Sequence, residues 1–174
     1  MKDFDIIKPQ MEVILREELL SIIEKNSRID FKELAVLLGA TEEEVFNEIT
    51  ALEKEGIICG YHTLINWEKT SQEKVMAIIE VKVTPQRGRG FDEMAERIYN
   101  YPEVKAVYLI SGGYDLMVIL EEKTLKEIAG FVSDKLSTLD SVLSTATHFI
   151  LKKYKDHGTI LNKEYKDERE VITP

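Results

Sequence analysis

The stretch GATEEEVFNEITALEKEG, from Gly39 to Gly56, has the pattern of the second half of a helix-turn-helix. Thr41 and Glu44 have the spacing of a capping box, the reciprocal pair of side chain–backbone bonds that begins many helices. Glycines stand where the preceding helix and this one should end. An apolar stripe at helical spacing lies between them: Val45, Ile49 and Leu52. The stretch therefore predicts a short helix with sharp ends and one buried face.

Two further helices are predicted before it. Apolar residues at helical spacing indicate a helix from about Pro9, which suits a first turn, to about Lys25. Asp30 can cap a second helix over FKELAVLL, which Gly39 would end. A supporting helix and two helices joined by a tight turn make a helix-turn-helix module. The apolar segment IICGYHTLI that follows is expected to pair as a small strand or wing, with Cys59 buried.

The third helix is acidic, although this helix of the motif normally enters DNA. From Thr41 to Glu55 there are six glutamates and one lysine, and residues 1–62 hold seven basic and fourteen acidic side chains. Glutamates in a first helical turn complement the helix dipole and need no functional explanation. In a DNA groove, however, the same carboxylates oppose the phosphates, so we expect weak DNA binding that depends little on salt. Phe46 is either partly buried beside Val45 or exposed to a protein partner.

From Lys74 the hydrophobic period changes. Strands are predicted over 74–83, 104–110, 115–121 and 141–151, and helices over 91–100 and 124–139. The order β-α-β-β-α-β is the ferredoxin-like arrangement. The predicted fold class is therefore α+β. The predicted parts are a helix-turn-helix (winged-helix-like) domain at 1–62, a linker at 63–73, a ferredoxin-like effector-binding and oligomerisation domain at 74–161, and a polar tail at 162–174.

The predicted strands are apolar on both faces. In the first, Val75, Ala77 and Ile79 alternate with Met76 and Ile78. Two helices can cover only one face of a four-stranded sheet, and a wet face would alternate with polar residues. A second copy of the sheet is the simplest cover for the other face, which predicts a homodimer. The alternative is that the tail or the N-terminal domain covers it.

Composition narrows the class of protein further. The 174 residues carry a net charge of −9 and one cysteine, and no apolar run is long enough to cross a membrane or serve as a secretory signal. We expect a cytoplasmic protein without a membrane contact. The three histidines lack metal-ligand spacing, and no nucleophile–base pair stands out. We therefore predict no metal, no cofactor and no enzymatic activity.

Three segments carry a resemblance that covers about residues 10–161: LEKEGIICGYHTLIN, YLISGGYDLMVIL and STATHFIL. In order and spacing the chain resembles the Lrp/AsnC (leucine-responsive regulatory protein / asparagine regulator) family of transcription regulators. The resemblance implies a ligand-responsive regulator that dimerises through its C-terminal domain and often assembles into tetramers or octamers. It also implies a small-molecule effector, frequently an amino acid, bound where subunits meet.

The resemblance also suggests site residues. The exposed side of the third helix is basic in many members, whereas the matching positions here are Asn47, Glu48, Thr50 and Ala51. The candidate DNA-binding residues are Thr41, Glu43, Phe46, Asn47 and Thr50. The candidate effector-binding residues are Gly112, Gly113, Tyr114, Asp115, Thr145 and Thr147.

The candidate effector-binding residues also have a simpler structural interpretation. Gly112 and Gly113 can supply the positive φ of a hairpin turn, and the two threonines are ordinary strand formers. In the effector reading, glycine N–H groups meet a carboxylate and Asp115 meets an ammonium group. The alternative function is a metabolite-sensing or co-regulator module that has lost most DNA affinity and acts through a protein partner. An enzyme of similar architecture, a siroheme decarboxylase, is disfavoured because KVMAIIEVKVTPQ lacks the His and Arg such enzymes use.

Overall fold

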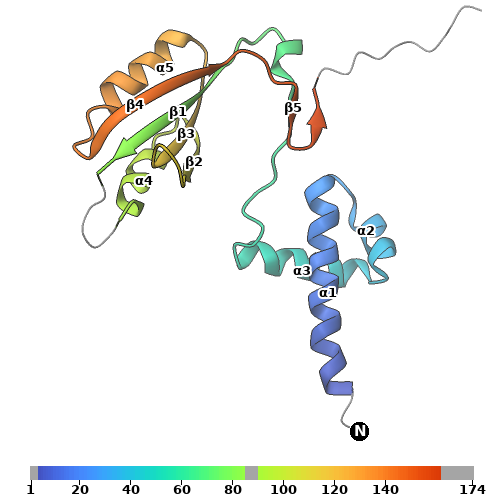
Figure 1. The fold of residues 1–174 in the computed structure, drawn as a ribbon. Coiled ribbons are helices and arrows are strands. Elements are labelled where there is room, and N and C mark those ends of the chain that lie inside the picture. The colour runs from blue at the N-terminus through green and yellow to red at the C-terminus, as the bar shows by residue number, and fades with distance from the viewer. Residues whose placement is uncertain (1–3, 85–89, 162–174) are drawn as a thin grey trace, which may run out of the picture. The chain divides into compact units, whose positions relative to one another are not determined.

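The chain divides into two compact units, Met1–Thr63 and Leu64–Pro174, which are described separately here. The structure is a computed structural model that describes residues 4–84 and 90–161. The predicted tail at 162–174 lies outside the described residues. Figure 1 shows the helices of the first unit, and the sheet of the second with its helices.

The first unit is a three-helix helix-turn-helix. Its helices are α1 (Phe4–Lys25), α2 (Phe31–Leu38) and α3 (Glu42–Lys54). The predicted caps are confirmed: the Asp30 carboxylate accepts from the Glu33 N–H at 2.7 Å, and Gly39 adopts a left-handed φ of 64°. All three helices contribute to one buried cluster: Leu19, Leu34, Ala35, Val45, Ile49 and Leu52. The apolar stripe of α3 therefore faces the core, as its spacing predicts.

Three local predictions about this unit were wrong. Helix α1 begins at Phe4, so Pro9 lies beyond its first turn. The segment after α3 forms no strand or wing within the described residues, because no second strand is present there to pair with it. Instead the N–H groups of Ile57 and Ile58 both reach the Leu52 carbonyl, at 2.9 and 3.2 Å, and close the end of α3. Cys59, expected to be buried, is exposed.

The second unit is the predicted ferredoxin-like fold. Its elements are β1 (Val75–Val83), α4 (Asp92–Tyr99), β2 (Val104–Leu109), β3 (Leu116–Glu122), α5 (Leu125–Phe131) with a π-helical turn η2 (Val132–Leu136), and β4 (Val142–Ile150). The sheet order is β2-β3-β1-β4, and every neighbouring pair is antiparallel. The register shifts between Lys82 and Val83, where β1 passes β4.

Both helices pack on one face of this sheet. Residues from α4, α5 and η2 share a single cluster with the inward side chains of β1 and β3: Ala77, Ile79, Val81, Val83, Met94, Ile98, Leu116, Val118, Leu120, Ile128, Phe131 and Leu136. Tyr101 adds an edge-to-face contact with Phe131 at 5.3 Å between ring centroids. The opposite face receives neither helix.

Residues 64–73, most of the segment expected to be a linker, belong to the second unit. A short 3-10 turn, η1 (Trp67–Lys69), forms there, and the Asn66 side-chain amide donates to the Leu161 carbonyl at 3.1 Å. A small hairpin of β5 (Lys155–Asp156) and β6 (Thr159–Ile160) follows β4. His157 and Gly158 turn it with φ angles of 42° and 78°. The sequence analysis did not predict this hairpin, although a glycine after a polar residue is typical of tight hairpin turns.

Candidate DNA-binding and effector-binding sites

One face of α3 points away from the helix-turn-helix core. Glu43, Phe46, Asn47 and Thr50 lie at i, i+3, i+4 and i+7, so they share a face, and all four are exposed. Thr41 precedes them at the cap, where its hydroxyl donates to Glu44 Oε2 at 2.9 Å and accepts from the Glu44 N–H at 3.2 Å. The Thr41 hydroxyl is therefore already used by the helix, and a contact to DNA from it would compete with the capping box.

Most glutamates of this helix have partners inside the unit. Glu48 and Glu55 accept from Arg16 of α1 at 2.5 and 2.8 Å, from Nε and Nη2 respectively. Glu53 accepts from the Tyr61 hydroxyl at 2.9 Å, and Glu44 completes the capping box. Within the part of the chain described, this leaves Glu42 and Glu43 as the glutamates of α3 without a side-chain partner. The acidity of α3 is therefore largely structural, and only part of it opposes DNA.

Three side chains in and around α3 have shifted pKa values: Glu44, Arg16 and Tyr61. Hydrogen bonds from the Thr41 N–H and hydroxyl lower the pKa of Glu44. Hydrogen bonds to Glu55 and Glu48 raise the pKa of Arg16. Burial, and then the bond to Glu53, raises the pKa of Tyr61. The shifts favour an ionised Glu44, a protonated Arg16 and a neutral Tyr61, the forms that make these hydrogen bonds at neutral pH.

Phe46 is 52% exposed, so its side chain is not mainly buried beside Val45. Its ring packs edge-to-face with that of Phe31, the first residue of α2, at 5.8 Å between centroids and 77° between planes. The Thr50 hydroxyl donates to the Phe46 carbonyl at 2.8 Å, which commits its proton to the helix backbone. The outer face of α3 thus combines an aromatic ring, an amide and a threonine methyl group with one free carboxylate.

The turn between β2 and β3 contains the candidate effector residues from Gly112 to Asp115. Asp115 fastens this turn to β1: its N–H donates to the Val81 carbonyl at 3.1 Å, and its Oδ2 accepts from the Val83 N–H at 2.8 Å. Its own carbonyl accepts from the Ile110 N–H at 2.8 Å. One carboxylate oxygen therefore replaces a ladder hydrogen bond where β1 changes register, a role that sequence reasoning missed.

Neither Gly112 nor Gly113 has a positive φ, so the predicted conformational reason for these glycines was wrong. A methyl group at Gly113 would meet no atom within 4 Å, and at Gly112 only an ordinary contact of 3.7 Å with Ile110. Both glycines are exposed. Neither the backbone conformation nor the packing within this chain therefore requires glycine at these positions.

The two candidate threonines lie on β4. Thr145 is opposite Val81 and Thr147 is opposite Ile79, so both are on the helix-covered side of the sheet. Thr145 is thus one strand from the Asp115 turn, at the same end of the sheet. Thr147 lies one pair further from that end. The structure brings Thr145 towards the turn more closely than Thr147.

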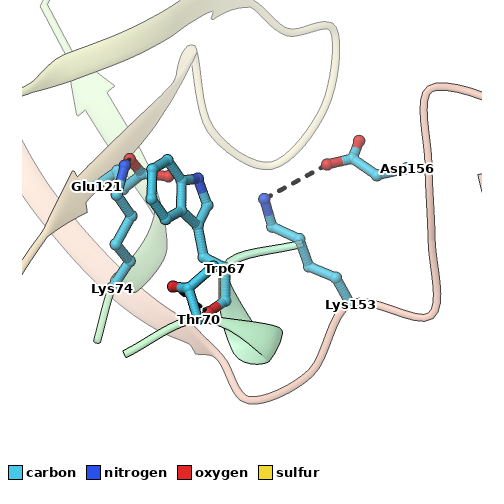
Figure 2. A network of polar contacts seen from close by, with 6 residues as sticks. All are labelled: Trp67, Thr70, Lys74, Glu121, Lys153 and Asp156. Atoms are coloured by element: carbon cyan, nitrogen blue, oxygen red, sulfur yellow. Dashed lines mark hydrogen bonds and ion pairs between the residues drawn. The ribbon is translucent and has the colours of Figure 1, made fainter. Parts of the chain in front are cut away.

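A groove of about 530 Å³ lies at the opposite end of the sheet. Trp67, within the expected linker, lines this groove, and Lys74 Nζ lies 3.9 Å from the centroid of its ring. Lys74 also pairs with Glu121 at 2.6 Å, and Lys153 with Asp156 at 3.4 Å (Figure 2). Sequence reasoning missed this groove, although Trp67 is the chain's single tryptophan. Both lysines have carboxylate partners, whereas no ion pair involves the other charged residues of the lining among the described residues: Glu68, Glu73 and Lys152.

The sheet face without helices carries mostly apolar side chains. The strand register places these residues on it: Met76, Ile78, Ala106, Tyr108, Met117, Ile119, Ala146 and Ile150. Met76, Ile78, Met117 and Ile119 are already half-buried, and Tyr108 is 50% exposed. A polar pair, Glu80 and His148, lies among them at 3.4 Å. Neither helix of the second unit packs over this face, which we call the open sheet face, although Met76 and Ile150 at one end of it also line the Trp67 groove.

Among the described residues, no group of three or more His, Cys, Asp or Glu side chains is placed to hold a metal ion. No helix in the same ranges is long and apolar enough to span a membrane.

A helix-turn-helix unit joined to a ferredoxin-like unit defines a class of two-part transcription regulators, in which one part meets DNA and the other a small molecule. Residues 76–160 match the Lrp/AsnC ligand binding domain. The chain is 51% identical over 158 residues to the HTH-type transcriptional regulator YugG of Bacillus subtilis, covering 90% of this chain and 95% of YugG. It is 32% identical over 137 residues to the HTH-type transcriptional regulator LrpA of Pyrococcus abyssi, covering 79% and 94%.

The chain therefore belongs to the Lrp/AsnC family, a family of transcription regulators and not of enzymes. Solved structures share the fold. Escherichia coli AsnC matches with a TM-score of 0.63 at 20% identity, covering 85% of this chain and 97% of AsnC. A transcriptional regulator from Neisseria meningitidis, solved in complex with L-methionine, matches with a TM-score of 0.65 at 21% identity, covering 82% and 91%.

Proposed function

We propose that this regulator binds an amino-acid effector at the turn between β2 and β3, dimerises through its open sheet face, and binds DNA through the outer face of α3. The observation that carries the effector site is the pair Gly112 and Gly113. Glycine lowers stability where its flexibility is not needed, because it loses the most entropy on folding. Two exposed glycines without a conformational or packing reason indicate that another molecule approaches the backbone there.

The chemistry of this turn suits an amino acid. Backbone N–H groups of the glycines are donors for a carboxylate, and Asp115 carries the opposite charge for an ammonium group. Only Oδ2 of Asp115 has a hydrogen-bond partner in the described structure, so Oδ1 can accept from a ligand. The Neisseria relative binds L-methionine, which makes amino acids the first effectors to test.

Dimerisation would complete this site. A second copy of the chain packed on the open sheet face would remove its apolar side chains from water. A two-fold axis would bring the same apolar residues of both copies together. Further pairing into tetramers or octamers would place several helix-turn-helix units on one duplex. Such avidity offsets a weak contribution from each unit.

A protein partner in place of DNA is the second candidate function. The exposed Phe46 and Phe31 rings, beside unpaired Glu42 and Glu43, favour it. Capture of genomic DNA fragments by the purified protein, at low and at physiological salt, distinguishes the two. Fragments enriched at both salt concentrations support DNA binding, whereas none at either would favour the partner.

The effector site is tested by thermal melting with a panel of L-amino acids. A ligand at 100 times its dissociation constant adds about 2.7 kcal/mol of stability, which is readily seen as a higher melting temperature. Gly113→Ala should fold normally, since the new methyl group has free space, and should lose this gain. Gly130→Ala in α5, where the nearest atom is 3.9 Å away, is the matched control and should keep it. A Gly113→Ala variant that responds like the wild type would move the site, first to the Trp67 groove.

A further inference from the structure

The outer face of α3 is an unusual reading surface because it holds no cation among Glu43, Phe46, Asn47 and Thr50. Guanine is recognised in the major groove mainly by bidentate Arg or Lys, which this set of four lacks. Adenine is recognised by the amide of Asn or Gln, and the thymine C5-methyl group by apolar side chains such as Phe or the methyl of Thr. Glu43 can accept from a cytosine amino group, but the other three residues, Phe46, Asn47 and Thr50, all match A·T pairs.

The contact with Phe31 orders the Phe46 side chain in the absence of DNA. Its ring packs edge-to-face with Phe31, with 5.8 Å between the ring centroids, and its backbone belongs to a helix capped at Thr41. A side chain already ordered loses less rotamer entropy when it binds. An aromatic pair in this edge-to-face arrangement is also favourable in itself. The 52% exposed ring is thus both ordered and accessible.

Asn47 and Thr50, which lie beside Phe46 on this face, also suit contacts with A·T pairs. Asn47 is adjacent on the face and carries both a donor and an acceptor. Thr50, one turn after Phe46, has committed its hydroxyl proton to the Phe46 carbonyl, which leaves its methyl group and oxygen lone pairs for a partner. Two of the nearby glutamates, Glu48 and Glu55, are held by Arg16.

We propose that Phe46 is a specificity-determining residue that packs on thymine methyl groups in the major groove, with Asn47 beside it reading adenine, so that this regulator selects A·T pairs under α3. This inference rests on the proposed DNA binding through α3. It adds the kind of base pair selected and the atom that is recognised, the thymine C5-methyl carbon.

The test removes that carbon without changing base pairing. A duplex enriched by the full-length protein from genomic DNA is resynthesised with deoxyuridine in place of thymidine, one position at a time. Wild-type protein should lose roughly fourfold in affinity at one or two positions in each half-site, as expected for one buried methyl group. Phe46→Ala should bind the unmodified duplex more weakly, and deoxyuridine at those positions should cause no further loss.

Two further variants separate readout from folding. Phe46→Leu keeps an apolar contact and should retain part of the deoxyuridine effect. Val36→Ala, on α2 and 76% exposed, is the control and should show the full wild-type effect. Melting temperatures of all variants check the fold.

Several results would overturn the inference. Deoxyuridine could weaken wild type and Phe46→Ala equally, or leave the wild type unaffected, in which case DNA binding stands but Phe46 does not read thymine. Equal losses for Phe46→Ala on specific and random duplexes would also assign the residue a non-selective role. Failure to enrich any fragment at either salt concentration would overturn the proposed function as well, and Phe46-dependent capture of a protein in its place would identify the partner alternative.

Discussion

Arg16 of α1 binds Glu48 of α3, with Nε and Oε1 2.5 Å apart, and so draws this glutamate towards the supporting helix. The same guanidinium reaches Glu55 at 2.8 Å, two turns further along α3. These contacts join elements more than thirty positions apart in the chain. They explain why a helix in the DNA-reading position can be rich in glutamate: part of that charge ties α3 to α1.

The first prediction compares two substitutions on α3. Glu48→Lys places an ammonium group against Arg16, so it should lower the melting temperature and add little to DNA binding. Asn47→Lys, on the outer face, should leave the melting temperature unchanged. It should steepen the dependence of log affinity on log salt by about 0.9 if it reaches one phosphate. Fluorescence anisotropy with a random duplex at several salt concentrations measures this, and an equal gain for Glu48→Lys would place Glu48 on the DNA-facing side.

The second prediction separates the two roles of Asp115. Asp115→Ala leaves the part-buried Val83 N–H without its acceptor, which should cost about 1–3 kcal/mol in unfolding free energy. Asp115→Asn keeps an oxygen acceptor for that N–H and should cost much less. Both variants lose the negative charge, so both should lose the amino-acid-induced rise in melting temperature. An Asp115→Asn protein that still responds would show that the carboxylate serves only its own backbone.

The third prediction concerns the open sheet face. If the proposed dimer forms through this face, Ile119→Lys on β3 should convert the assembly into smaller species, because a buried unpaired charge opposes association. Light scattering on the full-length chain measures the mass. Leu125→Lys is the control, since Leu125 is 55% exposed at the start of α5 and should leave the assembly intact. A monomeric wild type at micromolar concentration would contradict the proposed interface.

The fourth prediction follows from Glu44. The capping box lowers its pKa in the folded chain below the ordinary value of 4.5, so the ionised form stabilises the fold. This stabilisation is complete above pH 4.5 and is lost as the pH falls through the lower folded-state pKa. Glu44→Gln can still accept from the Thr41 N–H but does not titrate. Its melting temperature, followed by helical circular dichroism, should therefore fall less than that of the wild type between pH 7 and the acid range; an identical fall would assign the acid sensitivity to other groups.

Local physics made much of this fold predictable from the sequence. The caps at Asp30 and Thr41 involve residues three apart, and the stripes that define helices and strands repeat every few residues. The order of the elements in the second unit then leaves few ways to form an antiparallel sheet. The same local patterns identified the exposed face of α3 and the turn before Asp115.

What the sequence alone determined was therefore the type, order and caps of the elements, and through them the family. The tertiary structure decided which glutamates of α3 are engaged by Arg16, that Asp115 replaces a ladder bond to Val83, and that Gly113 needs no special φ. It also decided that the segment after α3 does not form a strand in its own unit. The physical reason is that a local pattern reports neighbours within one turn or strand. A side chain's partner from another element depends on how the elements pack.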